Sequence, residues 1–299
     1  NEKNRAMVKI QEGCNQVCSY CIVPKVRGRE RSVPVSKIIS RINKLTSTSC
    51  KEVILTGTQL GSYGFDLKNV DLASLIGEVL SSTDVPRVRV SSIQPQEIDG
   101  RLLDLWSNPR LCPHFHVPLQ SGSPRILAAM RRRYDANKYM EALRLIRDNV
   151  ADASITTDVI VGFPGETDND FNLTKGICET AYFSDMHIFK FSNRPGTSAY
   201  YLEDTVPYRD KSSRSRQLTE ISRNSFVKFR NKFAGRNRNV LWESRERKKN
   251  ASFTHFGLTD NYIRVIADSD TDLKNMITPA YLAKIGSDPY GPMIGVVTS

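Results

Sequence analysis

The segment Met7-Val8-Lys9-Ile10-Gln11-Glu12-Gly13-Cys14-Asn15-Gln16-Val17-Cys18-Ser19-Tyr20-Cys21 decides which fold the chain must build. Its first four residues form an apolar, β-branched run that predicts a β-strand. Three cysteines then fall within one short loop, at Cys14, Cys18 and Cys21. Parallel α/β barrels carry their chemistry in loops beyond the carboxyl ends of strands, so we expect a reactive loop here.

Further apolar runs continue this pattern for about 200 residues and end at Gly, Pro or Ser. The strands expected are 7–10, 52–55, 87–90, 114–117, 157–161 and 186–189. Helices are expected near 36–45, 71–80, 98–106, 123–131, 136–147 and 168–180. Five or six strand–helix repeats predict parallel βαβ units, and hence a curved or barrel-like α/β sheet.

The pattern changes near Val206. Residues 209–232 read as a basic helix, and short strands follow at 239–243, 253–258, 262–266 and 294–297. Short strands separated by turns predict a small β-barrel of roughly 65 residues. We therefore expect a catalytic domain over 1–232 and a β-barrel domain over 233–299.

The net charge and the distribution of cysteines indicate the kind of binding partner and the redox environment of the protein. The 299 residues carry a formal net charge of +11, which favours a polyanionic partner, although a basic enzyme surface explains the same excess. The cysteines are unevenly spread, unlike those of a disulfide scaffold, so we expect a reducing, cytoplasmic setting. No apolar run approaches the length of a membrane span, so no membrane partner is expected.

Three thiolates on one loop suit a cuboidal 4Fe–4S cluster in which one iron has no protein ligand. Such an open iron distinguishes a catalytic cluster from a closed electron-transfer cluster. Structural zinc would need a fourth ligand, and no His lies near the loop in sequence. His116 or Cys112 would have to supply that ligand in space, so zinc stays open as the alternative.

The octapeptide from Cys14 to Cys21, with Tyr20 before the third cysteine, resembles the signature of radical S-adenosylmethionine (SAM) enzymes. Nearly the whole chain is similar to the methylthiotransferase branch of that superfamily. The matching segments are 13–34, 55–64, 116–123, 130–134, 157–167 and 189–197, and 257–265 resembles a TRAM domain, which binds RNA. The resemblance implies a partial parallel (β/α)6-type radical SAM barrel followed by a small, TRAM-like C-terminal all-β barrel.

The resemblance also implies cofactors and their sites. Cys14, Cys18 and Cys21 would hold the 4Fe–4S cluster, whose open iron binds SAM, and an electron from the cluster then yields a 5′-deoxyadenosyl radical. The cofactor-binding positions implied are Tyr20, Thr56, Gly57, Gln120, Ser121, Val159, Ile160 and Gly162. Core packing at Tyr20 and tight turns at the two glycines are the structural alternatives.

The tRNA anticodon stem-loop is the macromolecular partner that the resemblance implies, with a flavodoxin- or ferredoxin-like reductant and a sulfur donor. Arg27, Arg131, Arg132 and Arg264 are candidate RNA contacts. The first three are equally candidates for binding the cofactor carboxylate, and a solvated basic surface is the alternative for any single one. The C-terminal aromatics lie among basic residues, as in proteins that stack on single-stranded RNA. Most must also fill a small core, so we expect one or two to face RNA among Trp242, Phe253, Phe256 and Tyr262.

Three branches of the family differ in substrate: isopentenyladenosine in tRNA, an aspartate of a ribosomal protein, and N6-threonylcarbamoyladenosine in tRNA. Thr58 stands where the first two branches usually carry Gln, and 91–99 and 111–114 look more like the third. Positive charge would also repel a basic ribosomal protein. We therefore expect methylthiolation at C2 of threonylcarbamoyladenosine. A metal-stabilised RNA-binding protein is the non-enzyme alternative.

The family carries an N-terminal domain with its own three cysteines and a second 4Fe–4S cluster. This chain starts just upstream of the cysteine loop, and Cys50, Cys112 and Cys178 do not form a clustered triad. We expect each of them to be a small buried residue. The second cluster would then belong to a domain outside this sequence, so this part alone would cleave SAM without completing methylthiolation.

Overall fold

The computed structural model describes residues 4–248 and 252–298. Six parallel strands curve around one interior in two three-stranded sheets, ordered β1-β4-β5 and β6-β7-β8. They are β1 Arg5–Lys9, β4 Glu52–Thr56, β5 Arg87–Val90, β6 His114–His116, β7 Ser154–Val161 and β8 Asp185–Lys190. Single bridges, Val88 to Leu111 and Ser92 to His116, join the sheets. Within the described residues β8 does not pair with β1, which confirms an open, partial barrel.

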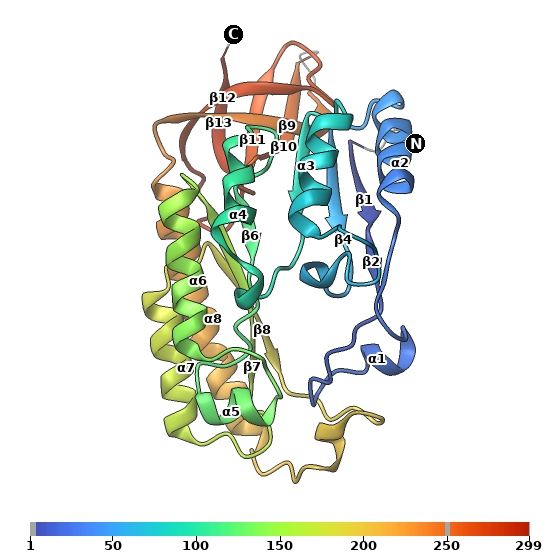
Figure 1. The fold of residues 1–299 in the computed structure, drawn as a ribbon. Coiled ribbons are helices and arrows are strands. Elements are labelled where there is room, and N and C mark those ends of the chain that lie inside the picture. The colour runs from blue at the N-terminus through green and yellow to red at the C-terminus, as the bar shows by residue number, and fades with distance from the viewer. Residues whose placement is uncertain (1–3, 249–251, 299) are drawn as a thin grey trace.

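Helices follow the strands and cover the outside of this barrel (Figure 1). They are α2 Val35–Ser47, α3 Leu72–Ser82, α4 Gly100–Leu103, α5 Pro124–Ala129, α6 Ala136–Asn149, α7 Asp168–Thr180 and α8 Tyr208–Asn231. Asp71, Asp135 and Thr167 cap three of them by accepting a backbone N–H three residues on. No helix in the described ranges is long and apolar enough to cross a bilayer.

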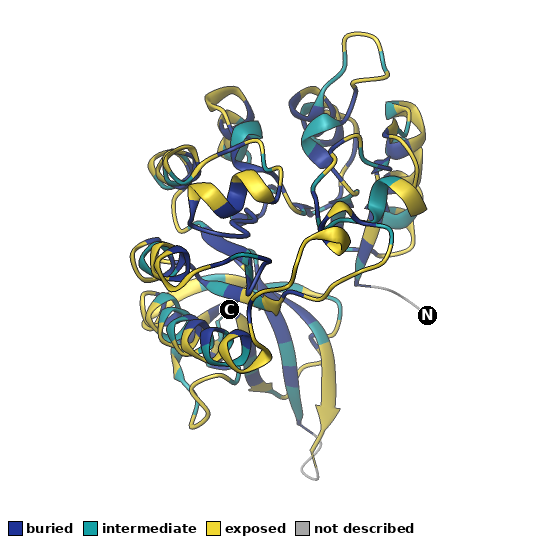
Figure 2. Ribbon diagram, turned by 90° about the horizontal axis from the view of Figure 1, so that it is seen from below, coloured by how far each residue is buried: buried dark blue, intermediate teal, exposed yellow. Residues whose placement is uncertain are grey.

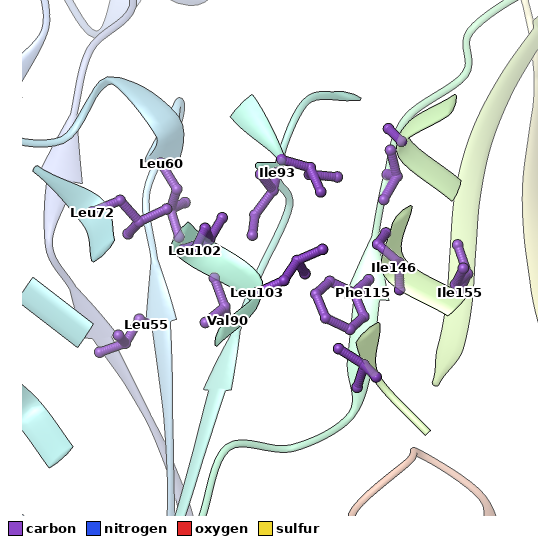
Figure 3. Packing of buried hydrophobic residues seen from close by; sticks show 14 of the residues in the cluster. Leu55, Leu60, Leu72, Val90, Ile93, Leu102, Leu103, Phe115, Ile146 and Ile155 are labelled. Atoms are coloured by element: carbon purple, nitrogen blue, oxygen red, sulfur yellow. The ribbon is translucent and has the colours of Figure 1, made fainter. Parts of the chain in front are cut away.

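The main hydrophobic core lies between the outer face of the sheets and the helices (Figure 3). Along β7 the side chains alternate, so Ile155, Val159 and Val161 are buried in this core whereas Asp158 and Ile160 are only half-buried. The helices expose their opposite faces (Figure 2). The interior of the barrel therefore carries polar and partly accessible residues, as a substrate-binding fold requires.

A closed five-stranded barrel follows α8, in the order β10-β11-β13-β12-β9. Its strands are β9 Arg236–Arg247, β10 Phe253–Thr259, β11 Arg264–Ser269, β12 Ile277–Ile285 and β13 Met293–Val297. It meets the amino end of the parallel strands, where Arg87 donates to the carbonyl oxygens of Leu258 at 2.9 Å and Asn239 at 2.7 Å. The predicted boundary at 232/233 falls between α8 and β9, and it stays a prediction.

A buried carboxylate ties the amino ends of the first three strands together. Glu52 of β4 is inaccessible to solvent and pairs with Arg5 and Arg89, each at 2.9 Å. Burial disfavours its charge, but the neighbouring arginines outweigh that penalty and lower the pKa of Glu52 below its ordinary value. The ion cluster thus holds β1, β4 and β5 together where the C-terminal barrel meets them.

Glu52→Gln is expected to lower the free energy of unfolding by about 3–5 kcal/mol at pH 7, because it leaves buried arginines without their counter-charge. A carboxyl with a lowered folded-state pKa stabilises above its unfolded pKa and loses that contribution as pH falls through the folded value. Urea denaturation from pH 7 to pH 3 should therefore show a weaker acid destabilisation in the variant. Glu12→Gln, at a pair exposed to solvent, is the control and should leave the midpoint unchanged.

Candidate active site at the cysteine loop

The cysteine loop leaves the sheet just after β1. A short antiparallel pair, β2 Gln11–Glu12 with β3 Arg31–Ser32, closes its base. The amide of Cys14 donates to Gly28 at 3.1 Å, and that of Ser19 donates to Met130 at 3.0 Å. The loop is therefore anchored both on its own returning arm and at the end of α5.

All three loop cysteines are free thiols that are partly accessible to solvent. Burial raises the pKa of Cys14 to about 11 and raises the pKa of Cys21 above its ordinary value. Metal binding must therefore displace protons at these sulfurs. A soft, three-thiol donor set of this kind fits an iron–sulfur cluster.

The only tight group of possible metal ligands among the described residues lies elsewhere. His116, Asp158 and His187 place one ligand atom each within 4.8 Å of one another. His116 is engaged there with Asp158 at 3.1 Å. The three loop cysteines offer thiols alone, which suits an iron–sulfur cluster.

Arg132 reaches into the cysteine loop from the chain just beyond α5. Its Nη1 donates to Cys18 Sγ at 3.3 Å and to Tyr20 Oη at 3.4 Å. Its Nη2 donates to Gln94 Oε1 at 3.1 Å. The sequence predicted an RNA contact at this position; the contacts observed place its charge beside the cluster ligands.

A chain of buried amides continues from this arginine across the carboxyl ends of the strands. Gln94 donates to Gln16 Oε1 at 3.1 Å and also to Gln59, which in turn donates to Glu97. Gln11 Oε1 accepts from the Gln59 amide at 2.9 Å. Burial raises the pKa of Glu97. The sequence analysis did not identify these four glutamines or Glu97 as site residues.

The predicted cofactor positions gather around the same edge of the barrel. Tyr20 and Ile160 pack against one hydrophobic cluster. Thr56 ends β4, and its carbonyl accepts from Ile10 N at 2.9 Å. A methyl group added at Gly57 would press on Gln11 at 2.9 Å, so a close backbone approach requires this glycine.

The fourth and fifth strand ends meet through backbone bonds. Gln120 has a φ of 63°, donates to Asp158 O at 2.8 Å and accepts from Ile160 N at 2.9 Å. Val159 points into the helix core, so it would meet a cofactor through its backbone. Ser121 is buried and lies 3.2 Å from the hydroxyl of Thr174.

Gly162 has a φ of 71° and donates to Glu166 Oε2 at 2.7 Å. It lies one residue beyond β7, at the carboxyl edge of the barrel. These positions stay predictions for SAM binding.

The other predicted RNA contacts lie at the surface. Arg27 is exposed and pairs with Glu12 at 3.4 Å. Arg131 is exposed and donates to Ser198 Oγ at 3.4 Å. Arg264 is exposed at the start of β11. Their accessibility suits contact with a phosphate backbone, and their role stays a prediction.

The remaining cysteines are separate from the loop. Cys50, Cys112 and Cys178 are at most 2% exposed, and two of them pack in the main core. This confirms the expectation that each is a small buried residue.

The sequence matches the Radical SAM superfamily over residues 8–175. It is 40% identical over 262 residues to threonylcarbamoyladenosine tRNA methylthiotransferase MtaB of Aquifex aeolicus, covering 87% of this chain and 62% of that protein. It is 32% identical to MtaB of Bacillus subtilis, covering 99% and 66%. It is also 37% identical to tRNA-2-methylthio-N(6)-dimethylallyladenosine synthase of Dictyoglomus thermophilum, covering 91% and 61%. The chain thus spans a little under two thirds of these relatives.

Two solved structures share the fold at low sequence identity. Coproporphyrinogen III oxidase of Escherichia coli superposes with a TM-score of 0.53 and 13% identity, covering 74% of this chain and 52% of that one. Methylornithine synthase superposes with a TM-score of 0.52 and 12% identity, covering 76% and 68%. At these identities the likeness establishes the fold and nothing finer.

Proposed function

Because this chain belongs to the radical SAM superfamily, we propose that it is the catalytic part of an enzyme that methylthiolates C2 of N6-threonylcarbamoyladenosine beside the tRNA anticodon. The observation that carries the proposal is the loop of Cys14, Cys18 and Cys21, three free and partly accessible thiols on one anchored loop. The 40% identity to an MtaB protein supports the tRNA substrate and favours the threonylcarbamoyl base.

The chain's own residues have distinct tasks in this proposal. When bound, the cluster and SAM supply a 5′-deoxyadenosyl radical, which abstracts hydrogen. Cys14, Cys18 and Cys21 would hold the cluster through their thiolates. Arg132 fixes the Cys18 sulfur and Gln94 by hydrogen bonds of 3.3 and 3.1 Å. Tyr20 and Ile160 provide an apolar surface beside the cofactor.

Completion of the reaction needs further components. A sulfur donor and a second 4Fe–4S cluster would supply the sulfur atom of the methylthio group, and a second SAM molecule would donate its methyl group to that sulfur. A flavodoxin- or ferredoxin-like protein would supply electrons. The C-terminal barrel would bind the anticodon stem-loop, with Arg264 among its contacts. An adenine in a folded loop is partly stacked, so it must be extruded to reach the barrel. We place the enzyme in the cytoplasm, with tRNA.

A second candidate substrate is dimethylallyl (isopentenyl) adenosine, which the 37% identity to a dimethylallyladenosine synthase favours. The two substrates are distinguished by mass spectrometry of tRNA nucleosides from cells that lack the gene. We expect the methylthio form of threonylcarbamoyladenosine to disappear, and to return with the full-length gene but not with a Cys18→Ala copy. Disappearance of the methylthio dimethylallyl nucleoside instead would establish the second candidate. If both nucleosides persist, the chain acts on another substrate, such as a ribosomal protein, or is an RNA-binding protein without this activity.

A further inference from the structure

A cavity of about 930 Å³ lies inside the parallel barrel and reaches to α8 and the C-terminal barrel. Its wall from β1, β4 and β5 carries Met7 and Ile54 beside Arg5 and Arg89. The opposite wall, from β6, β7 and β8, is mainly polar. The strands of this polar wall lie next to one another in Figure 1. Apolar side chains together with hydrogen-bonding groups suit a flat, aromatic ligand with polar substituents.

Three side chains of the polar wall, His116, Asp158 and His187, place ligand atoms within 4.8 Å of one another. His116 Nε2 lies 3.1 Å from Asp158 Oδ2, and its Nδ1 lies 2.9 Å from Thr156 Oγ1. His187 pairs in register with Asp158 on the neighbouring strand, and its ring centroid lies 5.8 Å from that of His116. Thr156 fixes the orientation of the His116 ring. The trio thus presents the His187 ring and the Asp158 carboxylate to the cavity, with His116 held between Thr156 and Asp158.

The position of these three residues along their strands sets their distance from the predicted cofactor site. Asp158 precedes Ile160 by two residues on β7, so both side chains face the interior about 6–7 Å apart along the strand. The radical must meet C2 of the adenine at the carboxyl edge. The N6 substituent of that base points away from C2 and therefore deeper into the cavity, to the level of the trio.

Charge in the cavity favours an anionic substituent. Its lining includes Arg223, Arg230 and Arg264, besides Arg5 and Arg89, which pair with Glu52, against the carboxylates of Asp158 and Asp185. A threonylcarbamoyl group carries a carboxylate, a hydroxyl and a ureido N–H, whereas a dimethylallyl group carries none of these. Polar groups left unpaired in a closed site strongly disfavour an apolar analogue.

We infer that His116, Asp158 and His187 form the subsite that binds the threonylcarbamoyl group of the substrate base. Asp158 accepts the ureido N–H and His187 donates to the carbonyl or carboxylate oxygen, while His116 holds the Asp158 carboxylate in place. This inference rests on the proposed function, because it assumes that the base enters this cavity with C2 toward the cysteine loop. It assigns substrate selection to residues that neither cleave SAM nor hold the cluster.

The test uses the full-length, cluster-loaded enzyme and three synthetic anticodon stem-loops that differ in one base: threonylcarbamoyladenosine, dimethylallyladenosine or adenosine. Fluorescence anisotropy gives each Kd. The wild-type enzyme should bind the threonylcarbamoyl form at least about tenfold more tightly than the adenosine form. His187→Leu and Asp158→Asn should each reduce that ratio to about threefold or less, with the Kd for the adenosine form unchanged. Asn172→Leu, on the outer face of α7, is the matched control and should keep the ratio.

The outcomes distinguish a failure of the subsite from a failure of the proposed function. If the wild-type enzyme methylthiolates the threonylcarbamoyl stem-loop but both variants keep the tenfold ratio, the subsite is wrong and the function stands. If the wild-type enzyme modifies only the dimethylallyl stem-loop, the proposed substrate fails together with the subsite. Metal analysis gives a further overturning result: one zinc or iron per chain lost specifically in His187→Leu would make the trio a metal site.

Discussion

Replacing Cys14, Cys18 or Cys21 by alanine is expected to abolish tRNA methylthiolation and remove the four irons of the radical cluster. In the proposed site each thiolate would hold one iron, and no other cysteine in the described residues is accessible to take its place. Iron and sulfide should be measured per chain after anaerobic reconstitution of the full-length enzyme, and product should be measured by nucleoside mass spectrometry. We expect product below detection for all three variants.

Cys178→Ala is the matched control for these variants. Cys178 is fully buried between α7 and the sheet, so its loss should weaken packing without touching the cluster. Iron content and product should match those of the wild-type enzyme, with a lower midpoint of urea unfolding. Four irons retained in Cys14→Ala or Cys21→Ala would contradict the ligand assignment.

Gly13→Ala is expected to displace the cysteine loop and to reduce cluster incorporation to less than half. Gly13 has a φ of 78°, and an added methyl group would overlap the carbonyl oxygen of Arg29. Backbone strain at such a φ costs about 1–3 kcal/mol, and the overlap with backbone adds to it. The returning arm must move, and it carries the Gly28 carbonyl that holds Cys14. The readout is iron per chain after reconstitution.

Gly28→Ala separates strain from overlap on the same loop. Gly28 has a φ of 72°, but an added methyl group there meets no atom within 4 Å. The substitution should therefore cost only strain, about 1–2 kcal/mol, and leave the iron content close to that of the wild-type enzyme. Equal iron losses in the two glycine variants would mean that the overlap with Arg29 does not matter.

The parallel barrel could be predicted from the sequence because its signals are local. Each strand is a short run of apolar residues ending at a turn residue, and helix starts such as Asp71 and Thr167 carry their own caps. The cysteine loop was equally clear, because three thiols at that spacing have few explanations. Both features depend on residues that are neighbours in the chain.

The C-terminal barrel was predicted with one strand missing. β12 has Pro279 in its third position, and proline within a run argues against a strand. The structure pairs this proline with Asn239 of β9 and buries Ala280 and Leu282. The barrel closes only with β12, and β12 is recognised as a strand from its pairing with β9 and β13 rather than from its own sequence.

The aromatic residues of the C-terminal barrel differ in how far they are buried, and therefore in whether they can contact RNA. Trp242 is fully buried in the barrel core. Tyr262 is 45% exposed, yet one face of its ring stacks on His114 at 4.5 Å between centroids. Among the predicted RNA-facing aromatics it combines exposure with a place on the cavity wall. Its contact with RNA stays a prediction.

The contacts of Arg132 could not be predicted from the sequence, because they depend on how the backbone turns after α5. In sequence it is the middle of three arginines, which read as a solvated basic surface. In the structure α5 ends at Ala129 and Arg131 takes a φ of 57°. That turn leaves Arg131 and Arg133 exposed and directs Arg132 to Cys18. The buried glutamines Gln16, Gln59 and Gln94 lie in three separate loops, too far apart in sequence for a pattern to link them.

The most direct test of this account is the electron paramagnetic resonance spectrum of the reduced, anaerobically reconstituted protein, recorded with and without SAM. An open iron predicts the signal of a reduced 4Fe–4S cluster whose shape changes when SAM is added, and the change should be absent in Cys18→Ala. Protein that takes up zinc but neither iron nor sulfide, or a cluster signal that SAM leaves unchanged, would contradict it.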